Sequence, residues 1–393
     1  MKKVILIFCD YYLPGYKAGG PIKSISSIVD RLGDQFTFKI VTRDCDYLSK
    51  EPYKDIVSNK WHRIGSAEVL YLGRRKRGFR PIHKVMNSVP YEAVYLNSFF
   101  SPHYSIKILL LRWLKLVPDV PYLLATRGEF SREALKLKPY KKRPFIVLVK
   151  ALGIYRGVKW HVSSQYEKQN FISVFCNNKK SSGECDVIVA SPLISLLNET
   201  EKIPSYAVKR PGHIKILFFA RVAPMKNLLE AIGLLRELSG DVEYNIYGPI
   251  DDVHYWSKCS KVMDLLPENI KIIYRGKVPP HQAKEIFEDH HLMFQPSLGE
   301  NFGHSIIESL LFGCPVLISD RTPWRDLEVE GVGWDIDLTD KEKFKMVLQN
   351  CINMDEAEYR DYRIRARKFA RMVAGDDEKV TAYENLFYNL LRN

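Results

Sequence analysis

The stretch that decides the fold is Gln295–Val316, which reads QPSLGENFGHSIIESLLFGCPV. An apolar strand ends at its start, Glu300 lies in the following loop, and a helix is expected to begin near Gly303. The N–H groups of a helix N-terminus attract an anion, and the carboxylates of Glu300 and Glu308 flank that position. Gly313 then ends the helix before the next strand. The stretch predicts a parallel α/β sheet that binds an anion between hydroxyl-bearing groups.

Short apolar runs alternate with helical patterns in two series along the chain. Strands of the first series are expected at 4–9, 36–42, 93–96, 122–126, 160–162 and 187–190, with helices near 21–33, 103–117, 142–154 and 164–174. After a polar stretch at 198–212, strands are expected at 214–220, 243–247, 270–274, 292–295 and 315–318, with helices near 226–238, 279–289 and 304–313. Such alternation implies parallel sheets with right-handed crossovers. We therefore predict an α/β fold with two Rossmann-like domains, 1–204 and 205–375.

The end of the chain has a different pattern. From residue 341 onward only helical periodicity is present, with a break at 374–376. We expect one helix before that break and one after it, over 376–393.

Length and composition agree with two globular domains. The 393 residues are about 2.6 times the ~150-residue prior for one domain. Apolar residues make up 46% and charged residues 27%, which excludes a disordered chain. Residues 1–205 hold 34 lysines and arginines against 17 acids, whereas the remainder holds 25 against 29. The first half is therefore expected to face an anionic partner such as a membrane surface, a phosphorylated acceptor or nucleic acid.

Cysteine usage and hydropathy point to a protein of the cell interior. The seven cysteines form no CxxC pair, and Cys9, Cys314 and Cys351 lie in apolar stretches. This pattern indicates reduced core cysteines, a reducing compartment and no structural zinc. The apolar run Val4–Cys9 is shorter than a secretory signal needs. No segment approaches the ~20 apolar residues of a membrane span, so we expect a soluble or peripheral protein.

Two further groups of residues have the chemistry of an anion site. Arg221 follows an expected strand and Lys226 lies five residues later, so both cations are predicted at the carboxyl edge of a parallel sheet, where they could clamp a diphosphate. Gly19 and Gly20 precede a helix that begins with proline, which lets the backbone approach an anion. The pair at 251–252 is predicted to be a loop or helix cap rather than a metal-binding motif.

These motifs together resemble the GT-B retaining glycosyltransferases of family 4. The features that carry the resemblance occur in family order: Gly19-Gly20, Arg221 with Lys226, Glu300 and Glu308 with seven residues between them, and the segment 313–316. The resemblance implies that Arg221 and Lys226 hold a pyrophosphate. It implies that Glu300, Phe302 and Gly303 contact the donor sugar and that Glu308 binds the ribose. It implies that the loop with Gly19 and Gly20 also binds the donor, at its phosphate and sugar. It also implies metal independence, and a last helix (376–393) that crosses back to the first domain.

Two positions depart from the family pattern. Many members carry a histidine after the fourth or fifth strand of the first domain, and the equivalents here are Asn97 and Arg127. Arg127 begins the triplet Arg-Gly-Glu, which resembles bacterial polysaccharide-assembly members. We expect Arg127 to neutralise phosphate or to orient the acceptor. Retention without an obvious nucleophile implies front-face displacement, with the leaving diphosphate stabilised by cations and a helix N-terminus.

The resemblance implies a hexosyltransferase-type enzyme that transfers a sugar from a UDP- or GDP-sugar to a glycan or polyprenyl-linked acceptor in cell-surface polysaccharide assembly. The expected location is the cytoplasm, peripherally at the inner face of the membrane, with the nucleotide-sugar as co-substrate and neither cofactor nor nucleic acid. Three alternatives remain open: a GT-B sugar-nucleotide epimerase, a basic nucleic-acid-binding protein suggested by the run 74–77, and a catalytically inactive GT-B scaffold.

Overall fold

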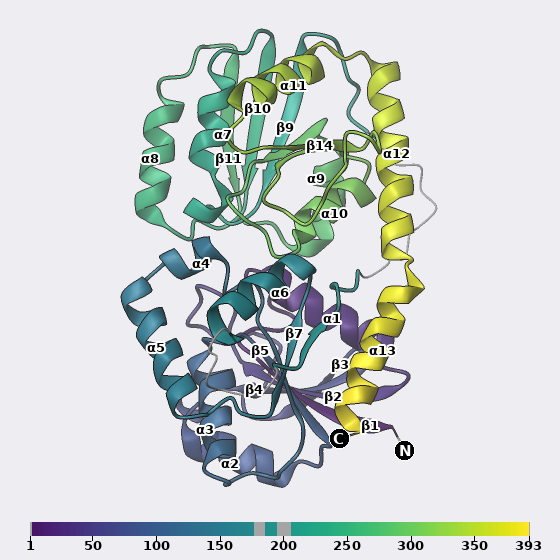
Figure 1. Cartoon of the computed structure of the whole chain (residues 1–393). Coiled ribbons are helices and arrows are strands. Elements are labelled where there is room, and N and C mark those ends of the chain that lie inside the picture. The colour runs from purple at the N-terminus through teal and green to yellow at the C-terminus, as the bar shows by residue number, and fades with distance from the viewer. Residues whose placement is uncertain (1, 177–184, 195–205, 393) are drawn as a thin grey trace. The chain divides into compact units, whose positions relative to one another are not determined.

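The computed structural model describes residues 2–176, 185–194 and 206–392 (Figure 1). The chain divides into two compact units, Met1–Ser195 with Asp376–Asn393 and Leu196–Gly375. The boundary that the sequence predicts between 204 and 205 lies outside the described residues.

The first unit is built on an eight-stranded sheet with the order β3-β4-β2-β1-β5-β6-β7-β8. Its strands are β1 (Lys3–Cys9), β2 (Phe36–Arg43), β3 (Trp61–Ile64), β4 (Ala67–Leu72), β5 (Ala93–Asn97), β6 (Tyr122–Ala125), β7 (Val158–Val162) and β8 (Val187–Val189). Strand β3 pairs antiparallel with β4, and the other pairs are parallel. The predicted parallel sheet is confirmed, and the sequence missed β3 and β4.

Helices cover both faces of this sheet because its central strands are apolar on both sides. Leu6 and Phe8 of β1 belong to one core cluster, whereas Ile5 and Ile7 belong to another. The helices are α1 (Gly20–Leu32), α2 (Phe79–Ser88), α3 (Lys107–Trp113), α4 (Arg132–Lys136), α5 (Pro139–Ala151) and α6 (Gln165–Phe171), with short helices η1 (Arg74–Lys76), η2 (Pro102–Ile106) and η3 (Ile172–Cys176). Helices α2, α3, α5 and α6 pack on the first cluster, and α1 packs on the second.

The second unit has a six-stranded parallel sheet with the order β11-β10-β9-β12-β13-β14. Its strands are β9 (His213–Phe219), β10 (Asp241–Tyr247), β11 (Ile270–Gly276), β12 (Leu292–Gln295), β13 (Val316–Ser319) and β14 (Gly333–Ile336). Between them lie η4 (Pro224–Lys226), α7 (Leu228–Leu235), α8 (Val253–Met263), η5 (Pro280–Gln282), α9 (Ala283–Glu288) and α10 (His304–Leu311). The second predicted series is therefore also confirmed, with β14 and α8 added.

Three helices, rather than the two expected, form the end of the chain: α11 (Lys341–Asn353), α12 (Glu356–Ala374) and α13 (Asp377–Leu391). The prediction of a single helix before the break is wrong because Asp355 starts a new helix. The Asp355 side chain accepts from the Glu358 amide while the Glu358 carboxylate accepts from the Asp355 amide, a reciprocal cap that begins α12. Helix α13 belongs to the first unit, where Tyr383 and Phe387 are buried in the same core cluster as α1.

The cysteines are only partly as expected. Cys9, Cys314 and Cys351 are buried, as the apolar context predicts. Cys176 and Cys185, however, form a disulfide, a pairing that the sequence analysis did not predict. Among the described residues, no helix is both long and apolar enough to cross a bilayer.

Candidate functional site

The predicted cations and carboxylate of the second unit lie on loops at the carboxyl edge of its sheet. Arg221 follows β9, Lys226 ends η4, and Glu300 lies in the loop between β12 and α10. Neighbouring parallel strands end at the same edge, so these loops are adjacent although they are far apart in the sequence. Strands β9 and β12 pair directly, with Met293 opposite Leu217.

Glu300 is the centre of a compact polar group. One of its carboxylate oxygens, Oε1, accepts hydrogen bonds from the Lys226 ammonium, from Gln295 Nε2 at 3.0 Å and from Ser297 Oγ at 3.0 Å. The Glu300 side chain is 9% exposed and that of Lys226 is 19% exposed. A partly buried carboxylate with three donors is fixed in position, and it in turn fixes the ammonium.

Arg221 has a carboxylate partner of its own. Its Nη1 lies 3.0 Å from Asp251 Oδ2, and the arginine side chain is 41% exposed. Asp252 caps helix α8 by accepting from the Tyr255 amide at 2.9 Å. The prediction of a loop or cap at 251–252 is thus confirmed, and Asp251 also serves as the partner of Arg221. Each predicted phosphate ligand is therefore held by one carboxylate.

Helix α10 begins as the sequence predicts. Gly303 adopts a left-handed conformation with φ 80°, and a Cβ there would lie 2.7 Å from Ile306 Cδ1. The helix has no side-chain N-cap, and its N-terminus directly follows the loop that carries Glu300. Phe302 packs its ring 5.3 Å from that of Trp324, and the Trp324 indole donates to the Phe302 carbonyl. Glu308 lies half-buried in the second turn of α10.

In the first unit, the glycine loop lies at the start of α1. Gly19 has φ 70°, which favours glycine, and an added Cβ would meet nothing within 4 Å. Gly20 is the first residue of α1, with Pro21 next to it. Glycine is therefore favoured at position 19 by the backbone conformation and not by crowding, because the space around its Cβ position is open.

Arg127 and Asn97 lie together at the carboxyl edge of the first sheet. Asn97 Oδ1 accepts from Arg127 Nη2 at 2.6 Å and from Arg127 Nε at 3.2 Å. The same Nη2 donates to the Tyr95 hydroxyl at 3.2 Å, and that hydroxyl lies 2.8 Å from His161 Nδ1. His161 Nε2 faces the Ala190 carbonyl at 2.9 Å, so we assign the ring proton to Nε2 and Nδ1 as the acceptor. Burial, with the Arg127 charge, lowers the pKa of His161 to about 3, which keeps this chain of hydrogen bonds neutral at the histidine.

Glu129, the acid of the Arg-Gly-Glu triplet, joins two loops of this edge. Its carboxylate accepts from Ser98 Oγ at 2.7 Å and from the Phe99 amide at 2.5 Å. Burial raises the pKa of Glu129 to about 7. Glu129 thus connects the loops that follow β5 and β6. The Arg127 guanidinium, by contrast, lies at the edge of the sheet.

The sequence missed the partners rather than the principal residues. Gln295 and Ser297 were inside the quoted stretch but were not singled out, although a glutamine that ends an apolar strand signals a polar edge. Tyr95 and His161 gave no such signal, because each lies inside an apolar run.

Comparison with known proteins places this geometry in context. Residues 199–369 match the family described as "Glycosyl transferases group 1". No curated protein matches the chain. Solved structures with the same fold include Anabaena HepE in complex with UDP and glucose, with a TM-score of 0.68, 14% identity and 100% of both chains covered. Sucrose-phosphate synthase from Thermosynechococcus elongatus is similar with a TM-score of 0.71, 14% identity and 100% of both chains.

A third similar structure is WaaG, a glycosyltransferase involved in lipopolysaccharide biosynthesis. The TM-score is 0.64 with 12% identity, and the match covers 93% of this chain and 95% of that chain. These likenesses establish the two-unit GT-B fold that the sequence predicts.

Proposed function

We propose that this protein is a glycosyltransferase that transfers a hexose from a nucleotide-sugar donor to a glycan or polyprenyl-linked acceptor with retention of configuration. The observation that carries the proposal is the Lys226–Glu300 pair beside the N-terminus of α10, within the segment that matches the group 1 glycosyltransferases. HepE has been solved with UDP-glucose, which favours a UDP-sugar as the first donor to test, with GDP-sugars second.

The chemistry of the proposed step uses this chain's own charges. The bond between the sugar C1 and the diphosphate oxygen breaks, and the acceptor oxygen bonds to C1 on the same face. The acceptor proton passes to the leaving phosphate oxygen. Arg221, Lys226 and the α10 amides would stabilise the developing negative charge without a metal ion. Glu300 would hold Lys226 in place and contact the sugar, with Phe302 and Gly303 alongside and Glu308 at the ribose.

In the first unit, Arg127 is the proposed residue of the acceptor side, whereas the loop with Gly19 and Gly20 is proposed to bind the donor. The hydrogen bonds to Asn97 and Tyr95 orient the guanidinium, and this supports a role in orienting the acceptor or neutralising phosphate. The proposed setting is cell-surface polysaccharide assembly in the cytoplasm, at the inner face of the membrane.

The reaction has a direct test. Thermal-shift screening of UDP-, GDP- and ADP-sugars identifies the donor, and proton NMR of the product made from it is expected to show the donor's anomeric configuration. Activity is expected to survive EDTA. An inverted product, or activity lost on chelation and restored by Mn²⁺, contradicts the proposed mechanism. A new sugar nucleotide formed from the donor alone would instead indicate an epimerase.

The proposed membrane contact is the surface formed by α4, α5 and the residues around them. Its exposed apolar side chains are Leu137, Tyr140, Val147, Leu148 and Leu152, at 46–70% exposure. Its exposed cations are Lys136, Lys138, Lys141 and Arg143. Ile146 and Val149 on the other side of α5 are buried in the core, so the exposed apolar residues form a separate face. Mixed apolar and basic residues on one helix suit an anionic bilayer surface.

Liposome flotation tests this contact. Reversal of Lys138, Lys141 and Arg143 to Glu is expected to abolish binding to anionic vesicles, because each cation near such a surface contributes roughly 1 kcal/mol. Lys142 is left unchanged because its ammonium donates to the Ala134 carbonyl at 2.7 Å. Reversal of the exposed Lys50, Lys54 and Lys60 makes the same change in charge and is expected to retain binding. Wild-type protein that stays unbound at low salt would refute membrane docking.

A further inference from the structure

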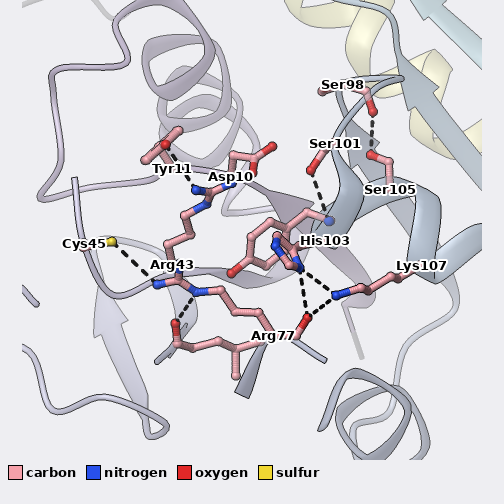
Figure 2. A network of polar contacts seen from close by, with 12 residues as sticks. Asp10, Tyr11, Arg43, Cys45, Arg77, Ser98, Ser101, His103, Ser105 and Lys107 are labelled. Carbon is pink, nitrogen blue, oxygen red and sulfur yellow. Dashed lines mark hydrogen bonds and ion pairs between the residues drawn. The ribbon is translucent and has the colours of Figure 1, made fainter. Parts of the chain in front are cut away.

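A second group of cations lies at the carboxyl edge of the first sheet, apart from Arg127 (Figure 2). Arg43 ends β2, Arg77 follows β4 and η1, and His103 and Lys107 belong to the helical segment after β5. Asp10 follows β1. These strands are neighbours in the sheet, so the fold gathers four basic side chains from three loops.

Arg43 contacts the two residues that follow β1. Its guanidinium pairs with Asp10, donates from Nη1 to the Tyr11 hydroxyl at 3.3 Å and lies 4.8 Å from the centre of the Tyr11 ring. Its Nε is buried and has no hydrogen-bond partner among the described residues. The arginine side chain is 23% exposed, so it faces both the protein and solvent.

Arg77 is buried beside the cluster and is held in place by the contacts of its guanidinium. It is 7% exposed, its Nη2 lies 2.7 Å from Asp44 Oδ1, and its Nε donates to the Leu72 carbonyl at 2.9 Å. Because Asp44 neutralises the Arg77 guanidinium, Arg77 adds no net charge to the cluster, and its role is to hold the neighbouring residues in place. Its own carbonyl is the acceptor for Lys107 Nζ at 2.8 Å.

Lys107 carries a positive charge that no acid balances. Its Nζ lies 2.8 Å from His103 Nδ1, and no carboxylate in the described part of the chain is within ion-pair distance. The same Nδ1 lies 3.0 Å from the Arg77 carbonyl oxygen, so His103 and Lys107 both contact that carbonyl. Burial together with the Lys107 charge lowers the pKa of His103, and burial lowers that of Lys107 itself. A half-buried ammonium without a counter-charge favours a bound anion.

A buried hydroxyl without a hydrogen-bond partner lies beside this cluster. Tyr104 is fully buried, and its hydroxyl has no hydrogen-bond partner in the described chain. Its ring lies 6.0 Å from the Arg43 guanidinium, and the charges of Arg77, Arg43 and Asp10 act on its hydroxyl. A buried hydroxyl without a partner costs about 1–3 kcal/mol, so a ligand oxygen that accepted from it would be favoured.

We propose that this edge is an oxyanion site that recognises a phosphate or carboxylate group of the acceptor. The proposal rests on the proposed function and names its acceptor as an anionic molecule. Lys107 supplies the uncompensated charge, while Arg43 Nε and the Tyr104 hydroxyl are the donors. The exposed cations Arg74, Arg75 and Lys76 of η1 lie on the loop that leads to Arg77, and they raise the local concentration of anions. The oxyanion comes from either a lipid-linked diphosphate or an acidic sugar.

The test uses the full-length protein and three probes: inorganic diphosphate, glucuronate and neutral glucose. Titration is followed by NMR of the ¹³C-labelled His103 ring, which His103→Ala assigns. We expect an anion to shift this resonance and glucose to leave it unchanged. Lys107→Met is expected to weaken anion binding tenfold or more, because it removes a charge-assisted contact. This variant leaves no carboxylate unpaired. Lys84→Met, at an exposed lysine of α2, is the matched control and is expected to bind like wild type.

Two comparisons separate this site from the proposed donor site. Diphosphate is expected to shift His103 as strongly in Lys226→Ala as in wild type. Preference for diphosphate indicates a phosphate-bearing acceptor, and preference for glucuronate indicates an acidic sugar. Unchanged binding in Lys107→Met, or a shift that disappears only in Lys226→Ala, overturns the oxyanion site and leaves the proposed glycosyl transfer intact. Anion binding at His103 without any sugar transfer would support the site and contradict the proposed function.

Discussion

Replacement of Lys226 by Met is expected to lower kcat/KM for sugar transfer by about 30- to 1,000-fold. The proposed ammonium contact to the leaving diphosphate is made mainly as negative charge develops, and loss of one such donor removes about 2–4 kcal/mol of transition-state stabilisation. Initial rates with the donor found by thermal shift provide the measurement. Lys341→Met is the matched control, because Lys341 forms an exposed ion pair with Glu230 in the same unit.

The Lys226→Met substitution is also expected to affect stability, so loss of activity must be separated from loss of folding. Lys226 is the partner of a carboxylate that is only 9% exposed, so its loss leaves Glu300 without its counter-charge and is expected to destabilise the fold. The double variant Lys226→Met/Glu300→Gln removes both charges and is expected to recover most of the melting temperature while staying inactive. If the double variant recovers activity together with stability, Lys226 has only a structural role and the proposed donor site is wrong.

Replacement of Gly248 by Ala is expected to lower the free energy of unfolding by roughly 3 kcal/mol or more. Gly248 follows β10 with φ 143°, and an added Cβ would lie 1.9 Å from the Ala220 carbonyl oxygen and 3.2 Å from the Arg221 amide. Backbone atoms cannot move aside as a flexible side chain can. The hydrogen bonds from the Ala220 amide to Tyr247 and from the Val222 amide to Pro249 would have to break.

The consequence of that clash extends to the proposed site, because the displaced backbone carries Arg221. Urea denaturation measures the stability, and the donor-dependent thermal shift measures the site. Gly233→Ala is the matched control: this glycine lies inside α7 with nothing within 4 Å of its Cβ position, and the change is expected to stabilise the helix by about 0.5–1 kcal/mol. A Gly248→Ala protein as stable as wild type would contradict the expected clash with the Ala220 carbonyl.

Local patterns in the sequence determined the elements of the proposed donor loop. The apolar run of β12, the left-handed glycine at 303 and the apolar face of α10 are all encoded within a few residues of one another, so the strand–loop–helix unit could be predicted. The same locality explains the errors. Strand β4 has apolar residues and was still missed, and the cap that separates α11 from α12 lies in four residues of an otherwise continuous helical pattern.

Only the tertiary structure decided which side chains meet. The sequence itself places Glu300 in a loop, but the approach of Lys226 across 74 positions depends on the pairing of β9 with β12. Likewise, Arg127 reaches Asn97 because β5 and β6 are neighbours, and Lys107 lies beside the Arg77 carbonyl because two loops end at one sheet edge. The spacing of apolar residues along the chain determines whether a segment is a helix or a strand. The order of the strands in the sheet determines which loops, and so which side chains, lie next to each other. Partners that depend on strand order therefore have no signature within a single stretch of the chain.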